Sequence, residues 1–283
     1  MVREKNIKKS IVILGGNDLA FEIFKLYKKN FHVYYLTRKI KKNLKIKNQI
    51  KIKYNAGEII GYLQKIKPLF VFNFLSVVSE NLEDNFKINI DIPIKLLNWI
   101  NKNNSCRLIL IGTSSEYGYK RHRVVSEKSN LSPVNLYGLS KAIQSYLADL
   151  YFKKFKSNFI IIRIFNLKGN IYNKKILIGK INNFVKKNYK KKKILKLGNL
   201  GSYRDYIDIS YAAKLIFTLS FKSPKGRIIN LGTGRSTLVR KLVDSIFVNY
   251  PKLRYIENIN KKNIFEPKVL IANTKSLRDI LKI

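Results

Sequence analysis

The chain has 283 residues, which is long enough for one large domain or for a core with an additional lobe. Apolar residues make up 46% of it, enough for a sizeable hydrophobic core, and the single cysteine, Cys106, excludes an intrachain disulfide. The first apolar stretch, residues 11–14, is too short for a signal sequence or a membrane span. We therefore expect a cytoplasmic protein with no membrane partner.

The charge of the chain is unusual, because 57 lysine and arginine residues face 17 aspartate and glutamate residues, a net charge of +40. A strongly basic surface can bind nucleic acid or an anionic membrane. However, the surplus is mostly lysine, spread along a chain that is also rich in Asn, Ile, Phe and Tyr, and all of these residues have A/T-rich codons. We attribute the charge to compositional drift and do not expect a nucleic-acid partner.

Apolar runs alternate with segments of helical periodicity along the chain. The expected strands are residues 9–14, 32–36, 49–53, 69–76, 108–113, 159–166 and 227–231. The expected helices are residues 19–26, 58–66, 80–102, 137–150, 176–189, 208–219 and 238–247. This alternation predicts an α/β fold, a doubly wound, Rossmann-like parallel sheet with ligand at the carboxyl ends of its strands.

The first predicted strand runs into a glycine turn and then a helix. This arrangement places a pyrophosphate on a helix N-terminus, so Gly15 and Asn17 are expected to contact a dinucleotide. At the end of the second strand, a carboxylate would bind the ribose 2′-hydroxyl of NAD, whereas an arginine suits the 2′-phosphate of NADP. Arg38 stands at this point, so the predicted cofactor is NADP, with NAD as the alternative.

Tyr137 and Lys141 are four residues apart at the start of a predicted helix, so they share one helix face. An ammonium beside a phenol favours the phenolate and lowers the pKa of the phenol. A tyrosine tuned in this way can exchange a proton near neutral pH. A hydroxyl from a neighbouring strand end can bind the same substrate oxygen. The pattern therefore indicates proton transfer on a carbinol or carbonyl while a hydride moves elsewhere.

The spacing of these residues resembles a known family. A strand that ends in Thr113-Ser114-Ser115-Glu116-Tyr117-Gly118, followed by Tyr137-x-x-x-Lys141, is similar to the extended short-chain dehydrogenase/reductases, in particular the nucleotide-sugar epimerase/dehydratase/reductase branch. Nearly the whole chain shares the resemblance. The family's glycine turn, Gly-x-x-Gly-x-x-Gly, is kept only at Gly15, because its other glycines fall on Asp18 and Phe21. We expect a rebuilt turn or poor cofactor affinity.

The resemblance implies roles for particular residues. Ser114, Tyr137 and Lys141 are expected to be catalytic. Glu116 falls where dehydratase members keep a catalytic glutamate, or it simply hydrogen-bonds backbone in the loop. Thr113 is the alternative catalytic hydroxyl and otherwise a substrate contact. Asn89 is expected either to contact the cofactor or to bond backbone at a helix irregularity. The other implied contacts are Leu75 and Ser76 for the cofactor, and Asn166, Arg204 and Arg235 for the substrate. No metal site is expected, and His122, in a nearby loop, is expected to be solvated.

The resemblance also implies an organisation and an activity. Residues 1–166 would form a dinucleotide-binding core, to which residues 207–232 return, and residues 167–283 a smaller C-terminal lobe that binds substrate. The expected protein is an NAD(P)-dependent 4-keto reductase or epimerase of a nucleotide-activated sugar, and a homodimer. Two alternatives remain: a 4,6-dehydratase that uses Glu116, and a catalytically degenerate basic scaffold that binds nucleic acid or membrane.

Overall fold

The computed structural model describes residues 9–40, 46–118, 123–258 and 267–283. Its centre is a seven-stranded sheet in the order β12-β7-β5-β4-β1-β2-β3, in which every neighbouring pair is parallel. The strands are β1 (Ser10–Leu14), β2 (His32–Thr37), β3 (Asn48–Lys51), β4 (Phe70–Asn73), β5 (Arg107–Thr113), β7 (Phe159–Ile164) and β12 (Arg227–Leu231). The predicted fold class is confirmed.

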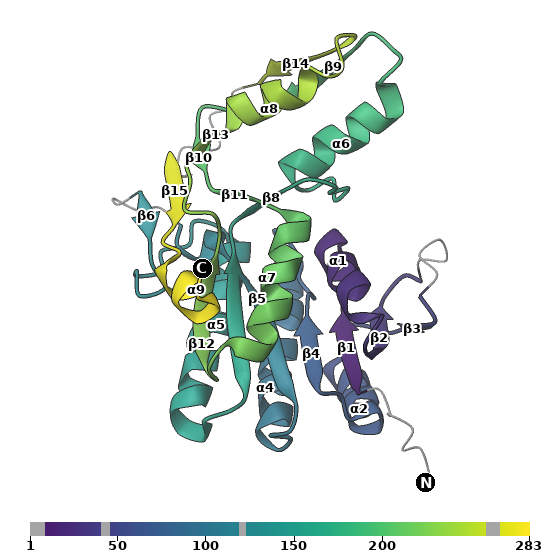
Figure 1. The fold of residues 1–283 in the computed structure, drawn as a ribbon, viewed down its shortest axis with the longest axis vertical. Coiled ribbons are helices and arrows are strands. Elements are labelled where there is room, and N and C mark those ends of the chain that lie inside the picture. Colours follow the sequence, from purple (N-terminus) through teal and green to yellow (C-terminus); the bar gives the residue numbers. More distant parts are fainter. Residues whose placement is uncertain (1–8, 41–45, 119–122, 259–266) are drawn as a thin grey trace.

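Helices cover both faces of the sheet (Figure 1). The helices on one face are α1 (Asp18–Tyr27), α7 (Ile209–Lys222) and α9 (Lys275–Leu281), and those on the other are α2 (Ala56–Ile66), α4 (Ile92–Asn101) and α5 (Leu136–Phe155). The apolar strands form because both of their faces are buried. In β7, for example, Ile160 and Ile162 pack in the core beneath α1 and α7, whereas Ile161 packs in the core beneath α2 and α4.

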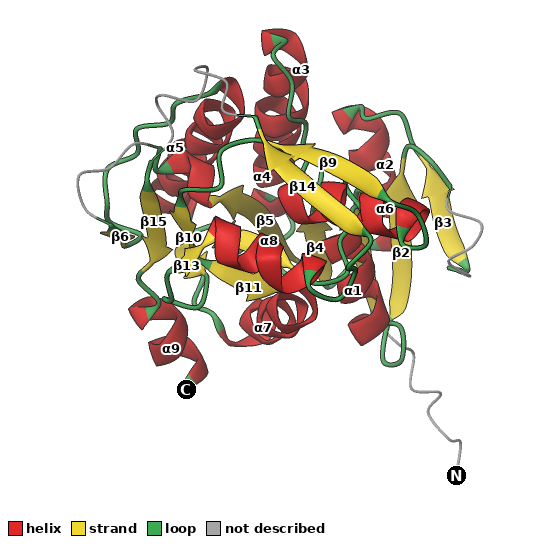
Figure 2. Ribbon diagram, turned by 90° about the horizontal axis from the view of Figure 1, so that it is seen from above, coloured by secondary structure: helices red, strands yellow, loops and turns green. Residues whose placement is uncertain are grey.

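A smaller lobe lies beyond the carboxyl ends of the strands, at the top of Figure 1 and over the sheet in Figure 2. It contains α6 (Leu177–Asn188), α8 (Val239–Phe247) and the parallel pair β9 (Lys193–Leu197) and β14 (Leu253–Glu257). Two short sheets join it to the core. They consist of β8 (Asn166–Lys168) with β11 (Tyr206–Asp208), and of β13 (Thr237–Leu238), β10 (Tyr203–Arg204), β15 (Val269–Ala272) and β6 (Val124–Val125). The lobe therefore roofs the edge where ligand is expected.

Two elements differ from the sequence prediction. The single helix expected over residues 80–102 consists of α3 (Leu82–Phe86), a π-helical turn η2 (Lys87–Asp91) and α4, because Asn89 bonds to backbone outside its own helix. The C-terminal helix α9, expected to lie with the lobe, instead packs against α7 and β12, with Leu277 and Leu281 in the core.

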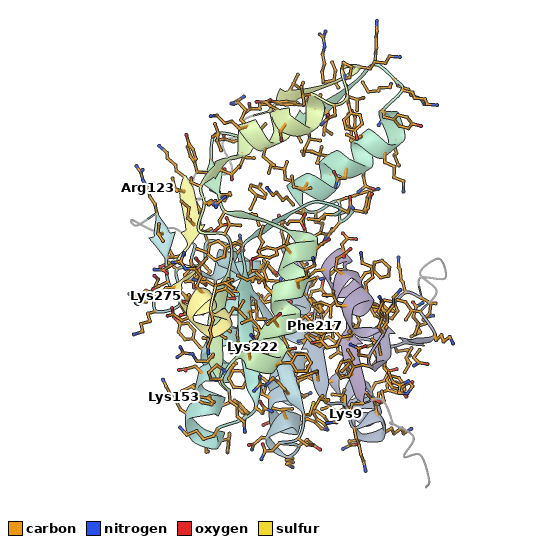
Figure 3. The ribbon with its side chains drawn as sticks, in the orientation of Figure 1. Lys9, Arg123, Lys153, Phe217, Lys222 and Lys275 are labelled. Atoms are coloured by element: carbon orange, nitrogen blue, oxygen red, sulfur yellow. The ribbon has the colours of Figure 1, made fainter. Side chains whose placement is uncertain are left out.

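The surface is basic on several sides. Figure 3 labels Lys9 before β1, Arg123 before β6, and Lys153, Lys222 and Lys275 on α5, α7 and α9, at separate places on the molecule. By contrast, Phe217 of α7 faces inward, with its ring 4.4 Å from the ring of Tyr27 on α1. Within the described ranges, no helix combines the length and the apolar character needed to cross a membrane.

Candidate functional site

A cavity of about 300 Å³ opens at the carboxyl ends of β4 and β5, beneath the lobe. Strand ends place side chains here because parallel strands finish at a common edge. The cavity brings together five of the residues singled out from the sequence as catalytic or substrate-binding, which are Thr113, Ser114, Tyr137, Lys141 and Asn166. Asn17, Leu75 and Ser76 line it as well. Side chains from both the core and the lobe therefore surround one space.

The Tyr137 phenol bonds to two hydroxyls, those of Thr113 at the end of β5 and Ser76 beyond β4. Burial raises the pKa of Tyr137 to about 12, the nearby Glu116 carboxylate raises it further, and the two hydroxyl bonds oppose this shift. The spacing of residues 137 and 141 predicted the opposite direction. Thr113 is thus the hydroxyl beside the phenol, while Ser114 is buried and lines the same cavity.

The Lys141 ammonium, which was expected to lower the pKa of Tyr137, is engaged elsewhere. Its side chain is 1% exposed, and its Nζ donates to the Ile111 carbonyl at 2.9 Å and to Oε1 of Gln144 at 3.1 Å. The ammonium is therefore held by the end of β5 and the next turn of α5, although it still lines the cavity. Burial lowers the pKa of Lys141 to about 8, and the negative charge of Glu116 only partly opposes this shift.

The low pKa of Lys141 predicts a pH-dependent stability. Between the folded value near 8 and the ordinary value of 10.5, the unfolded chain binds one more proton than the folded protein, so the free energy of unfolding rises with pH in this window. The rise attributable to Lys141 is about 3 kcal/mol. Urea unfolding at pH 7 and pH 10 should show this increment in the wild type and lose it in Lys141→Met.

Lys153→Met provides the control, because Lys153 lies on the same helix but is exposed and paired with Asp149. It should keep the increment. Tyr137 does not obscure the result, since its raised pKa weakens the fold only above its ordinary value of 10.0. An equal pH response in wild type and Lys141→Met would contradict the assignment.

A second cavity, of about 460 Å³, lies beside the first, at the ends of β1 and β2. Its lining includes Gly15, Asn17, Arg38 and Tyr54. The Arg38 guanidinium lies 4.6 Å from the centre of the Tyr54 ring, a stacking distance for a cation on an aromatic face. This end of the cleft offers a cation and an aromatic face to a phosphorylated nucleoside.

The turn before α1 fits a dinucleotide at its first glycine. Gly15 has a φ of 102°, and a Cβ there would come within 3.0 Å of the carbonyl carbon of Phe74, so only glycine suits this position. Asn17 caps the helix by accepting a hydrogen bond from the Ala20 amide. Phe21 is accommodated partly buried beside Phe24 rather than wedged between helix and strand. Asp18 stands at the position of the family's second glycine.

Glu116 is fully buried and does not line either cavity. Its Oε1 accepts the Thr113 amide at 2.8 Å, and its Oε2 accepts the Ser145 hydroxyl at 2.6 Å and the Arg163 guanidinium at 2.7 Å. Glu116 therefore joins the end of β5 to α5 and β7. Packing and charge pairing therefore explain why a glutamate stands at position 116.

Asn89 is also kept from the cavities by its own hydrogen bonds. It exchanges two bonds with the backbone of Val77, at 3.0 and 2.9 Å, and donates to the hydroxyl of Ser140 at 2.9 Å. Ser140 in turn donates to the Tyr137 carbonyl. Of the two roles considered for Asn89, the geometry corresponds to the structural one, which fixes the exit of β4 against the start of α5.

The two arginines expected to contact substrate lie outside both cavities. Arg204 donates to the Pro267 carbonyl at 2.7 Å, and Arg235 is exposed on the turn that follows β12. Asp205 holds that turn, because its buried carboxylate accepts the amides of Thr233 and Gly234, both at 2.8 Å. The pair at 204–205 thus organises the wall of the lobe.

Several residues of the cleft were missed by sequence reasoning. Tyr54 beneath Arg38 and the loop residues Tyr172, Asn173 and Lys175 line the cavities without any local pattern that marks them. Their partners lie far away in sequence, so only the folded chain reveals them. His122 lies outside the described residues. Among the residues that are described, no group of three or more His, Cys, Asp or Glu side chains could hold a metal ion.

The parallel sheet, the cleft along its carboxyl edge and the Tyr137–Lys141 helix define the class of Rossmann-like, extended short-chain dehydrogenase/reductase folds. The sequence model of the NAD dependent epimerase/dehydratase family matches residues 25–232. The chain belongs to this family. The match begins after the glycine turn, where the sequence departs from the family pattern.

Individual proteins agree with this placement. A GDP-6-deoxy-D-talose 4-dehydrogenase of Aggregatibacter actinomycetemcomitans is 29% identical over 186 residues, 64% of this chain and 61% of that protein. A UDP-glucose 4-epimerase of Mycoplasma genitalium is 26% identical over 96% of this chain and 83% of its own length. The crystal structure of UDP-glucose 4-epimerase from Thermus thermophilus in complex with NAD superposes with a TM-score of 0.80, at 18% identity, over 95% of this chain and 92% of that one.

These matches differ in extent. The chain spans less than two thirds of the length of the first curated relatives, 61% and 52%. At 18% identity, the likeness to the solved structure concerns the fold.

Proposed function

We propose that this protein is an NAD(P)-dependent enzyme that modifies a nucleotide-activated sugar, as a 4-keto reductase or an epimerase. The observation that carries the proposal is the Tyr137 phenol, which lines a cavity at the strand ends while bonded to Thr113 and Ser76. The nucleotide-sugar activities of the relatives named above support the choice of substrate class.

Tyr137 gives a proton to the oxygen of a sugar ketone or takes the proton of a sugar hydroxyl, and the Thr113 hydroxyl holds the same oxygen. Both groups line one cavity and are already hydrogen-bonded to each other, which lowers the entropic cost of reaching a reactive arrangement. Lys141 lines the same cavity and brings a positive charge to it. Ser114, the hydroxyl first expected to act, lines the same cavity, but Thr113 is the one that bonds to the phenol. Asn166, which lines the same cavity, would contact the sugar nucleotide.

The cofactor is proposed to be NADP. Its binding residues would be Gly15 and Asn17 at the turn, Leu75 and Ser76 beyond β4, and Arg38 at the far end. When bound, the nicotinamide supplies or accepts the hydride. Arg38 favours NADP over NAD because it can pair with a 2′-phosphate, and no carboxylate stands at the end of β2 to bind a free ribose hydroxyl.

Arg38→Ala should weaken NADPH binding about tenfold or more and leave NADH binding nearly unchanged, because the lost contact is to the 2′-phosphate. Fluorescence titration with each cofactor measures both dissociation constants. Lys39→Ala, which removes a neighbouring exposed charge from the same cavity, is the control and should affect NADPH less. Equal weakening for both cofactors would contradict a 2′-phosphate site.

The activity itself is tested by mass spectrometry of nucleotide sugars incubated with the protein and each cofactor. A reductase converts a 4-keto sugar to a product with two additional hydrogens and consumes NADPH. An epimerase gives a product of unchanged mass and altered retention time. Absence of conversion for every nucleotide sugar, together with absence of cofactor binding, would reject the proposal in favour of a scaffold.

We also propose a homodimer formed by the helices on the α4–α5 face. Exposed apolar side chains on α3 and α5 support this, since Phe86, Tyr146 and Leu150 are all more than half exposed. Burying such side chains against a second copy would remove apolar surface from water. Light scattering should give twice the monomer mass for the wild type and a monomer for Leu150→Glu.

A further inference from the structure

The carboxylate of Asp18 joins the core to the lobe. Asp18 is the first residue of α1, and its Oδ2 accepts the backbone amides of Tyr172 at 2.8 Å and Asn173 at 3.1 Å. We call this group the Asp18 clasp: the Asp18 carboxylate and the two amides that it accepts. It links residues 154 and 155 positions apart in the chain.

The clasp stands between the two cavities. Asn17, Asp18 and Asn173 belong to the lining of both, as do the residues that follow β4. A second tie crosses the same gap, because Nζ of Lys175 donates to the Val78 carbonyl at 2.9 Å. An extended ligand that reaches from Arg38 in one cavity to Tyr137 in the other must therefore pass the clasp.

The charges at this point favour one anion. The start of a helix attracts negative charge, and the two amides of the loop add donors directed at the same place. The Asp18 carboxylate already accepts hydrogen bonds from both amides. The diphosphate of a dinucleotide would bring further negative charge to the position where the family carries its second glycine, and like charges at close range repel.

We propose that the Asp18 clasp and the diphosphate of the cofactor exclude one another, so that Asp18 is a built-in anionic competitor that keeps the cleft closed until a dinucleotide displaces it. This inference rests on the proposed function, because it needs a dinucleotide that spans both cavities. The loop at residues 172–173 is then released from α1 when the cofactor binds.

The test is titration of the whole protein with NADPH, followed by fluorescence. Asp18→Asn removes the charge and keeps the size of the side chain, and should bind NADPH about tenfold more tightly or better. Glu22→Gln is the matched control, since it makes the same change of charge on the same helix, where Glu22 pairs with Lys25. It should bind NADPH as the wild type does.

Hydrogen exchange without cofactor gives an independent measure. In Asp18→Ala, the amides of Tyr172 and Asn173 should exchange faster than in the wild type, because their acceptor is gone. Equal exchange rates would overturn the clasp.

The outcomes separate the two proposals. Tighter binding by Asp18→Asn alone supports the competitor. Equal or weaker binding by this variant, with NADPH still bound by the wild type, overturns the competitor and leaves the proposed function intact. Absence of binding to every variant at millimolar NADPH overturns both.

Discussion

Replacing Tyr137 by Phe should reduce turnover of a 4-keto nucleotide sugar about 10³-fold, because the variant lacks the hydroxyl that exchanges the proton. The phenol lies in the cavity against Thr113 and Ser76, so its ring can remain in place when the oxygen is removed. The dissociation constant of NADPH should stay close to the wild-type value. Turnover followed by cofactor absorbance, and binding followed by fluorescence, measure the two effects separately.

Tyr146→Phe is the control for this experiment. Tyr146 lies on the same helix, but it is 56% exposed and does not line the cavity. It should keep full turnover. If Tyr137→Phe kept more than about a tenth of the wild-type rate, general acid–base catalysis by this phenol would be rejected.

Replacing Glu116 by Gln should lower the free energy of unfolding by about 3 kcal/mol, because the buried guanidinium of Arg163 then loses its counter-charge. Glu116 and Arg163 are 0% and 3% exposed in their side chains, so solvent cannot compensate either charge. Urea unfolding measures the change. Glu83→Gln, an exposed carboxylate on α3, should be nearly neutral.

The double variant Glu116→Gln with Arg163→Met should recover part of the loss, since removing both charges leaves neither one stranded. The single variant Glu116→Gln also separates the reductase or epimerase from the 4,6-dehydratase. In folded protein, Glu116→Gln should retain most turnover, because Glu116 does not line the cavity. A loss as large as that of Tyr137→Phe would instead support the 4,6-dehydratase alternative.

The sequence predicted the strands of the core well, because a strand buried on both faces needs a continuous apolar run, as in residues 159–164. It indicated a helix irregularity at Asn89 as one of two alternatives but not its form or its bounds, since the π-helical turn at residues 87–91 depends on the bond between Asn89 and the distant backbone of Val77. The packing of α9 depends equally on distant partners. Leu277 and Leu281 look the same in sequence whether they cover the lobe or the core.

The candidate site was predictable where its residues share a local pattern. The spacing of Tyr137 and Lys141 and the hydroxyls at the end of β5 placed four residues in one cavity. The direction of the Tyr137 pKa shift was not predictable, because the ammonium of Lys141 is held by the Ile111 carbonyl 30 positions away. A bond from Glu116 to loop backbone was one of the two roles considered, and the Thr113 amide provides it. Its side-chain partners Ser145 and Arg163 were missed, as they are 29 and 47 positions distant.

The lobe is assembled from separate passages of the chain. In the described part of the chain, its elements come from residues 124–125, 166–208, 232–258 and 267–272, and β6, β10, β13 and β15 can meet only after the last of these has been made. The sheet that joins the lobe to the core can therefore be completed only after α5, α7 and all seven strands of the central sheet have been synthesised. For the same reason, exchanging the lobe with that of a homologue would require several simultaneous splices rather than one cassette.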